Sequence, residues 1–305
     1  MTEGIVLLDK PSGETSFQSL SAVKRRLATR RVGHAGTLDK FANGLLVVLT
    51  GRMTRLCAFA TDLDKEYLAV VAFGKGTDTL DPEGSIIAEG PVPVRAELEA
   101  ILPRFRGDIV QVPPAYSAIH VGGRRAYEAA RSGENPSMPP RRVTIHELEL
   151  CEIAGAEATL RVACSKGTYV RALARDIAEA LGTCAHLKAL RRTRIGGFRV
   201  ANARPPAMFD PDVDVLPPSA FFDAAPSLGR LLVKPQYVDA VCSGVRLSGS
   251  FFAEEPTRDA SFGAFTTDGV LVAMIEKRAG TLRYAAAFPR TDATAAVSRR
   301  GGPGA

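Results

Sequence analysis

Short apolar runs alternate with amphipathic segments along the first part of the chain, which predicts a fold that mixes strands and helices. Residues 4–8 form an apolar run typical of a short buried strand. A helix capped by Thr15 or Ser16 is predicted next, because apolar residues recur at helical spacing after them. Those residues are Phe17, Leu20, Val23 and Leu27.

Further strands are predicted in the middle of the chain. Residues 45–49 are uniformly apolar, and residues 67–73 are apolar on both faces, which is typical of a central strand covered on both sides. Residues 143–153 and 159–164 predict two strands joined by a turn at Gly155. These segments together predict an extended sheet.

Two helices and a late hairpin complete the pattern. Residues 95–105 predict a helix, and residues 168–181 predict an amphipathic helix that ends at Gly182. Apolar and polar residues alternate again in 269–276 and 282–288, which predicts a hairpin. The fold class is therefore predicted to be α+β.

The composition changes between residues 203 and 226, where six prolines and four aspartates crowd together. Such a segment is typical of a linker or an extended strap. We therefore expect a first domain over residues 1–225 and a smaller one over 226–290. The small, polar residues 291–305 are expected to form a disordered tail.

The overall charge and the cysteines narrow the classes of protein. The chain has 305 residues, a formal net charge of +6 and five cysteines without a Cys-x-x-Cys spacing. The charge is compatible with a polyanionic partner. The odd cysteine count argues against a disulfide framework and a zinc site, and favours buried, reduced thiols in a cytoplasmic protein. No signal peptide or membrane-spanning run is evident, so no membrane partner is expected.

The run from Gly33 to Asp39, Gly-His-Ala-Gly-Thr-Leu-Asp, is the strongest candidate for chemistry. Its glycines allow unusual backbone conformations, and an aspartate there is ionised at neutral pH without an activating base. Asp39 is therefore a candidate nucleophile or general base. The local sequence alone favours a different interpretation, in which Asp39 caps a short helical turn over residues 40–43.

A basic cluster precedes this run, on one face and at the exit of the predicted helix. A lone run of charges is usually a solvated face, but these five cations have no acidic residue between them and favour phosphate contact. They are Lys24, Arg25, Arg26, Arg30 and Arg31.

Seven segments, in order between residues 4 and 200, resemble the bacterial tRNA pseudouridine-55 synthases, the TruB family. Each motif is weak alone, but seven at plausible spacing form a strong signal. The segments are Lys10–Ser16, Gly33–Asp39 with Gly44, Lys65–Tyr67, Gly76–Gly84, Gln111–Ala118, Cys164–Arg171 and Leu190–Arg192.

The resemblance implies that the T-loop uridine of tRNA, position 55, is isomerised to pseudouridine. It implies no metal, nucleotide or redox cofactor, and a cytoplasmic enzyme that binds the T-arm stem-loop as a monomer without an obligate protein partner. The implied fold is a mixed, largely antiparallel sheet flanked by helices. Residues 228–290 loosely resemble a PUA-like module, a small β domain that binds RNA in related enzymes.

The resemblance also implies roles for individual residues. Asp39 matches the catalytic aspartate, Arg171 the arginine that pairs with it, and Tyr67 the ring that lies against the uracil. The remaining substrate-binding residues are predicted to be His34, Tyr169, Leu190, Lys10, Arg25 and Arg26, with Lys10 more plausibly structural. Four positions depart from the family pattern, and these are Ala35, Lys40, Asn43 and His120.

Three other functions remain open. A non-catalytic tRNA-binding or folding factor would not need a buried carboxylate facing RNA, so the set Asp39, Tyr67 and Arg171 favours catalysis. A guide-RNA-dependent synthase working with partner proteins is disfavoured by the lack of long basic extensions. A generic acid-dependent hydrolase is disfavoured because no second catalytic carboxylate pairs with Asp39 by motif.

Overall fold

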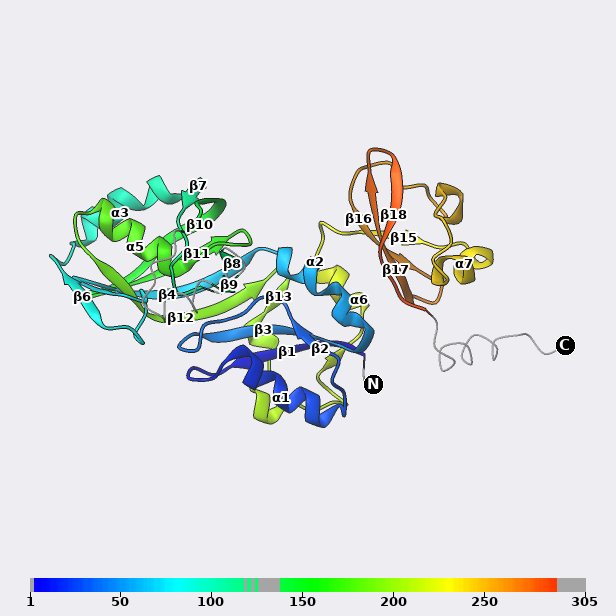
Figure 1. Cartoon of the computed structure of the whole chain (residues 1–305), viewed down its shortest axis with the longest axis horizontal. Helices are drawn as coiled ribbons and strands as arrows, with labels where there is room; N and C mark the ends of the chain where they lie inside the picture. Colours follow the sequence, from blue (N-terminus) through cyan, green and yellow to red (C-terminus); the bar gives the residue numbers. More distant parts are fainter. Residues whose placement is uncertain (1–2, 118–119, 122–123, 126–137, 290–305) are drawn as a thin grey trace.

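A ten-stranded, mostly antiparallel sheet dominates the computed structural model, which describes residues 3–117, 120–121, 124–125 and 138–289. Its strands run in the order β14-β1-β3-β12-β4-β11-β10-β7, with β13 beside β12 and β2 beside β3 (Figure 1). The strands are β1 (Gly4–Lys10), β2 (Val32–His34), β3 (Asn43–Thr50), β4 (Lys65–Phe73), β7 (Gly107–Gln111), β10 (Arg141–Ala154), β11 (Glu157–Cys164), β12 (Ala185–Ile195), β13 (Phe198–Arg199) and β14 (Val215–Leu216).

Helices cover this sheet unevenly. Two pack on the face of the strands around β4, and the rest lie around β1 and β3 (Figure 1). The predicted strands and helices of the first 200 residues are confirmed, and the predicted helix over 95–105 is an α-helix continued by a 3-10 turn. The helices are α1 (Ser16–Arg26), α2 (Cys57–Asp62), α3 (Arg95–Ile101), α5 (Val170–Ala180) and α6 (Ser219–Ala224), with 3-10 turns at Gly51–Leu56, Leu102–Phe105, Val200–Asn202 and Pro206–Met208.

The start of α1 is set by a capping box. The Thr15 hydroxyl accepts from the backbone N–H of Gln18, whose side chain accepts from the backbone N–H of Thr15. Leu20 and Val23 are buried as predicted. Phe17 is not part of the buried stripe, because it is 67% exposed. The ammonium of Lys24 lies over its ring instead.

Strand β3 is covered on both faces, whereas β4, for which this was predicted, is not. Leu46 and Val48 of β3 face α1, whereas Leu45 and Val47 face the opposite core. On β4 one face packs under α5, but Leu68 on the other face is 37% exposed. The hydrophobic pattern of β4 did not reveal this open face, because apolar residues stand on both of its sides.

The proline-rich segment is a strap that adds to the main sheet. Strand β14 pairs with β1, and Phe209 is fully buried between α1 and the sheet. The guanidinium of Arg26 donates to the carbonyls of Ala207 and Phe209. The strap is therefore held by packing and hydrogen bonds along its length.

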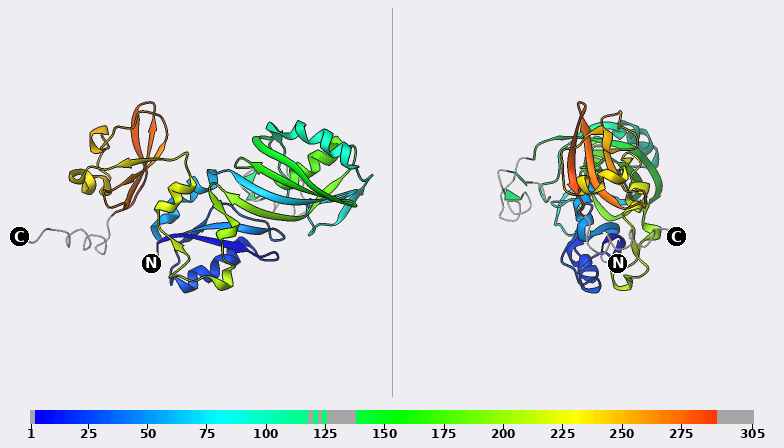
Figure 2. Two further views of the ribbon diagram at one scale, coloured as in Figure 1. Left: turned by 180° about the vertical axis from the view of Figure 1, so that it is seen from behind. Right: turned by 90° about the vertical axis from the view of Figure 1, so that its right-hand side faces the viewer.

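The last part of the described chain forms a separate four-stranded sheet at one end of the molecule (Figure 2). The predicted late hairpin is confirmed as β17 and β18. Phe265 and Phe288 join the core formed with Phe221 and Phe222 of α6, so hydrophobic packing ties this sheet to the main one. Its elements are β15 (Gly229–Leu232), α7 (Val238–Cys242), β16 (Ser261–Phe265), β17 (Leu271–Arg278) and β18 (Thr281–Ala287).

Two short hairpins lie outside the two larger sheets. The hairpins are β5 (Lys75–Thr77) with β6 (Ile86–Glu89), and β8 (His120–Val121) with β9 (Arg124–Arg125). None of the five cysteines forms a disulfide. Only Cys164 and Cys242 are buried as expected, whereas Cys57 and Cys184 are partly buried and Cys151 is exposed. Within the described ranges, no helix is long and apolar enough to cross a membrane. The predicted tail 291–305 lies outside the described residues.

Gly44 is a position where a side chain should disrupt the sheet. Its φ is +105°, and a Cβ there would contact the backbone carbonyl of Arg192 and lie 2.7 Å from the backbone nitrogen of that residue. We expect Gly44→Ala to lower the free energy of unfolding by more than about 2 kcal/mol. The control Gly155→Ala also has a positive φ, but it has open space around it. It should cost only about 1 kcal/mol. Equal losses in denaturant unfolding would contradict the role of the close approach.

Candidate active site

Asp39 lies in the irregular loop between β2 and β3. No helix follows it, and the chain makes a single turn in which the N–H of Ala42 donates to the carbonyl of Asp39 (3.2 Å). The interpretation of Asp39 as a helix cap is therefore wrong. The Ser16 hydroxyl, at the start of α1, holds the loop by bonding to both the N–H and the carbonyl of Leu38.

Arg171, in the first turn of α5, is the charged partner of Asp39. Its Nε lies 3.0 Å from Oδ2 of Asp39, and its Nη1 lies 3.2 Å from Oδ2 of Asp81. The same guanidinium donates to the carbonyls of Thr79 and Tyr116 at 2.9 and 3.0 Å. Only 5% of its side chain is exposed, against 39% for Asp39. A buried cation thus binds the inner side of a carboxylate that opens outward.

A cavity of about 310 Å³ adjoins this ion pair. Tyr67 from β4 and Leu190 from β12 contribute to its wall, so the structure brings together all three predicted catalytic residues. This volume falls at the lower end of small-molecule sites. The lining residues include Asp39, Tyr67, Arg171, Tyr169, Leu190, Lys65, Arg141, Ser165 and Arg192.

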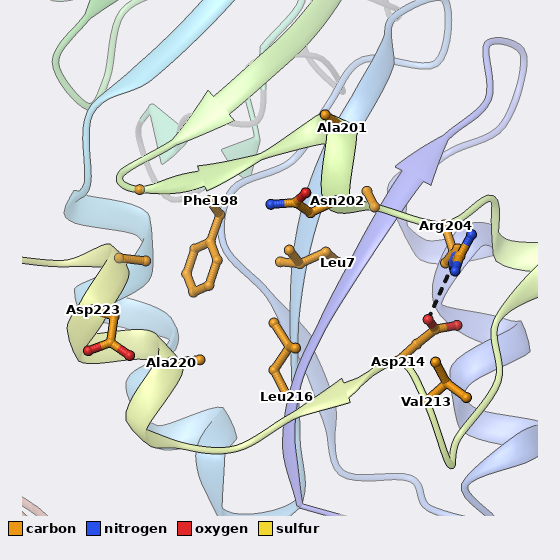
Figure 3. Close-up of a pocket in the computed structure, with 13 residues that line it drawn as sticks. Leu7, Phe198, Ala201, Asn202, Arg204, Val213, Asp214, Leu216, Ala220 and Asp223 are labelled. Atoms are coloured by element: carbon orange, nitrogen blue, oxygen red, sulfur yellow. Dashed lines mark hydrogen bonds and ion pairs between the residues drawn. The ribbon is translucent and has the colours of Figure 1, made fainter.

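A larger cavity lies elsewhere. It occupies about 630 Å³ beneath the strap, where Leu7, Phe198 and Leu216 point inward (Figure 3). Its prominent charged contact is an ion pair between Arg204 and Asp214 at the rim (Figure 3). It holds no carboxylate aimed at an open space by a buried cation, so the smaller cavity is the candidate active site.

Burial and charge act against each other on the titrating groups of the site. Burial raises the pKa of Asp39, the guanidinium of Arg171 opposes this rise, and the carboxylate of Asp81 adds to it. Burial also raises the pKa of Tyr67, which keeps its hydroxyl protonated. Burial lowers the pKa of Lys65 to about 8.

The other predicted binding residues divide into two groups. Tyr169 lines the cavity, where the guanidinium of Arg141 stacks on its ring and Gln111 fixes its backbone. His34 ends β2 close to the loop, and burial lowers its pKa. Both residues thus lie at or beside the cavity.

The structure does not bring Lys10, Arg25 or Arg26 to the cavity. Lys10 is fully buried, and its ammonium donates to the carbonyls of Pro11, Glu14 and Lys40. Arg25 and Arg26 lie at the far end of α1, about 15 Å from its start at 1.5 Å per residue. Lys10 therefore supports the loop from inside, as its structural interpretation implies.

Sequence reasoning missed three polar residues of the site. Asp81 enters the sequence analysis only through the segment Gly76–Gly84, an acidic loop, Arg192 only through Leu190–Arg192, and Lys65 only through Lys65–Tyr67. Alternation along β4 and β12 was the available signal, because it places Lys65 on the same face as Tyr67. Nothing in the sequence indicates the long-range contact between Asp81 and Arg171.

Two of the departures from the family pattern make visible contacts. The ammonium of Lys40 lies 3.7 Å from the carboxylate of Glu83, with both side chains about half exposed. The side-chain oxygen of Asn43 accepts from Arg191 at 2.9 Å. Within the described ranges, no group of three or more His, Cys, Asp or Glu side chains could hold a metal ion.

Comparison with known proteins matches one family over both stretches of sequence that contribute residues to the site. Residues 24–170 match the model of the TruB family pseudouridylate synthase N-terminal domain, and residues 171–205 match that of the tRNA pseudouridylate synthase B C-terminal domain. The chain is 50% identical to the tRNA pseudouridine synthase B of Azoarcus sp. (strain BH72) over 67% of its length and 68% of that protein. The chain is 38% identical to the tRNA pseudouridine synthase B of Caulobacter vibrioides, over 94% of its own length and 96% of that protein.

Solved structures show the same fold. A chain in a Cbf5-Nop10-Gar1 complex is 25% identical, has a TM-score of 0.71, and matches 95% of this chain and 84% of its own length. A chain in an archaeal box H/ACA Nop10-Cbf5 complex is 24% identical and has a TM-score of 0.71. The match covers 95% of this chain and 87% of that chain. The likeness therefore extends through the C-terminal sheet.

The raised pKa of Asp39 predicts a pH-dependent effect of removing its charge. A carboxyl whose pKa is higher in the folded than in the unfolded state loses its stabilising contribution as the pH rises through the folded value. Asp39→Asn should therefore raise the melting temperature near neutral pH, because Arg171 keeps Asp81 as its partner. The gain should vanish below the ordinary pKa of 3.8. The exposed control Asp212→Asn should leave the melting temperature unchanged. A loss of stability for Asp39→Asn at neutral pH would contradict an unfavourable burial of the Asp39 charge.

Proposed function

The chain belongs to the TruB family of pseudouridylate synthases, and from this premise we propose that it isomerises the uridine at position 55 in the T-loop of tRNA. It is an enzyme that converts a tRNA uridine to pseudouridine. The observation that carries the assignment to this site is the Asp39–Arg171 ion pair, 3.0 Å long, at a cavity that Tyr67 also lines.

The reaction breaks the bond between C1′ of the ribose and N1 of uracil, and then joins C1′ to C5. C5 loses its proton in the second step and N1 gains one, so the atoms of the nucleoside are conserved. The electron pair of the first bond leaves with the uracil, so positive character develops at the sugar and negative charge on the base. A carboxylate at the mouth of the cavity is suited to stabilise or attack the sugar. Asp39 meets this need, and Arg171 keeps it aimed and favours its ionised form.

The uridine must leave its stacked position to reach Asp39. Extrusion costs about a few kcal/mol, which contacts inside the site must offset. Tyr67 and Leu190 offer one aromatic and one apolar surface for the base, and both are buried in the wall. Arg141 and Tyr169, stacked at the rim, are suited to contact the ribose or its phosphates.

Asp81 acts in this proposal as a positioning residue. Arg171 is nearly inaccessible to solvent, and a buried guanidinium needs more than one acceptor to offset its desolvation. Asp81 supplies a second carboxylate on the side away from the cavity. Its charge also limits how strongly Arg171 binds Asp39, so Asp39 keeps reactivity.

We also propose a role for the C-terminal sheet, an oligomeric state and a cellular location. The C-terminal sheet, residues 226–290, is proposed to be a PUA-like module that contacts tRNA beside the first domain, residues 1–225. We propose that the enzyme acts as a monomer without an obligate protein partner, because Asp39, Arg171 and Tyr67 of one chain meet at the cavity. A cytoplasmic location follows from the proposed tRNA substrate.

Asp39→Ala should abolish pseudouridine formation while leaving tRNA affinity within about threefold, because binding rests on cations elsewhere. The measurement is incubation with an unmodified T-arm hairpin, followed by mapping of pseudouridine. Asp78→Ala, an exposed acid of the nearby acidic loop, is the matched control and should retain turnover. Residual turnover by the Asp39 variant would exclude it as the catalytic carboxylate.

Arg25 and Arg26 should differ, although they are neighbours on α1. Arg25→Glu should weaken tRNA binding and reduce its dependence on salt concentration, since Arg25 is exposed and α1 carries further cations. Arg26→Glu should lower the melting temperature, because it removes the hydrogen bonds to the strap. Unchanged affinity for Arg25→Glu would exclude this helix from the tRNA surface.

A further inference from the structure

Arg192 on β12 is a buried cation that the mechanism above does not use. It is 1% exposed and is among the largest fully buried side chains. Its guanidinium donates to the carbonyls of Leu45 (2.7 Å), Gly36 (3.0 Å) and Thr37 (3.5 Å). In the part of the chain that the structure describes, no carboxylate forms an ion pair with it. An arginine stays protonated even when buried, so the dipoles of these backbone carbonyls offset much of its charge.

Tyr67 is the functional group that faces this charge. Arg192 and Tyr67 are register partners on β12 and β4, so their side chains lie on the same face, where the charge of the guanidinium acts on the phenolic oxygen. A guanidinium has donors but no acceptor, so in a hydrogen bond between these two side chains the oxygen of Tyr67 accepts. The single hydrogen of the hydroxyl is thereby left for an acceptor elsewhere, and Tyr67 lines the cavity.

We propose that Arg192 is a positioning residue that orients and polarises the Tyr67 hydroxyl, so that Tyr67 donates a hydrogen bond to the departing uracil. When the C1′–N1 bond breaks, its electron pair spreads onto the carbonyl oxygens of the base. One of these oxygens accepts the hydrogen bond, and no proton is transferred in this step. This inference rests on the proposed function, and it assigns to Tyr67 a donor role during bond cleavage.

Two further observations fit a donor. Burial keeps Tyr67 protonated, as a hydrogen-bond donor must be, and the charge of Arg192 partly offsets the rise in its pKa. A polarised hydroxyl is a stronger donor, and such a donor is worth most where water is excluded. Among the described residues, Asp39 is a carboxylate whose charge acts on Arg192, and both residues line the cavity, so the field of Arg192 reaches the space the base would occupy.

A double-mutant cycle tests the proposal. The rate of pseudouridine formation is measured with enzyme in excess over a T-arm hairpin, for Arg192→Met, Tyr67→Phe and the double variant. In the wild-type background, Arg192→Met should lower the rate of pseudouridine formation roughly 100-fold. In the Tyr67→Phe background the same change should cost less than about tenfold. Arg191→Met, on the opposite face of β12 and paired with Asp9, is the matched control and should show no coupling to Tyr67.

Each outcome decides the question. Equal losses in both backgrounds would overturn the proposal, since Arg192 would then only hold the loop at Gly36 and Thr37. If Arg192→Met fails to fold, the same double-mutant cycle with Tyr67→Phe is measured with Arg192→Lys, which keeps the charge. Failure of Arg192→Lys to fold would also overturn it, because the carbonyl contacts would then be the essential role. Wild type without turnover would instead contradict the proposed function.

Discussion

The geometry of the site depends on one buried guanidinium. Arg171 is the point at which the loop carrying Asp39, the acidic loop carrying Asp81 and the segment ending at Tyr116 meet the first turn of α5. None of these segments is a helix or a strand at the point of contact. A charge that is withdrawn from water needs several acceptors at once. The requirement to satisfy Arg171 therefore fixes the relative positions of loops that regular hydrogen bonding would leave undetermined.

This arrangement also places an acid where a polyanion must approach. Asp39 is partly open to solvent, and burial and the charge of Asp81 both raise its pKa. The folded state is thus less stable with Asp39 ionised than it would be with a neutral group of the same shape. Such a cost is common at functional sites, where reactivity and stability make opposing demands on one residue.

The sequence predicted the elements better than the environment of individual side chains. Periodicity located β1, β3 and α5, because apolar spacing is set by one short segment. The role of Asp39 came from the family resemblance, since its local sequence favoured a helix cap that the structure lacks. The pairing of Arg171 with Asp81 could not be predicted, because it joins residues 90 positions apart that share no local pattern. The open face of β4 could not be predicted for a similar reason, since the burial of a sheet face depends on which distant segments pack against it.

The position of the arginines shows why a net charge of +6 is a poor guide to the tRNA surface. Arg26, Arg171 and Arg192 each donate to backbone carbonyls of irregular segments, namely the strap, the acidic loop and the loop before β3. Carbonyls outside helices and sheets need donors when they are buried. A guanidinium has five donors in a rigid plane, so it can satisfy several carbonyls together. Part of the positive charge thus holds irregular segments in place, and other exposed cations, such as Arg25, are proposed to bind phosphate.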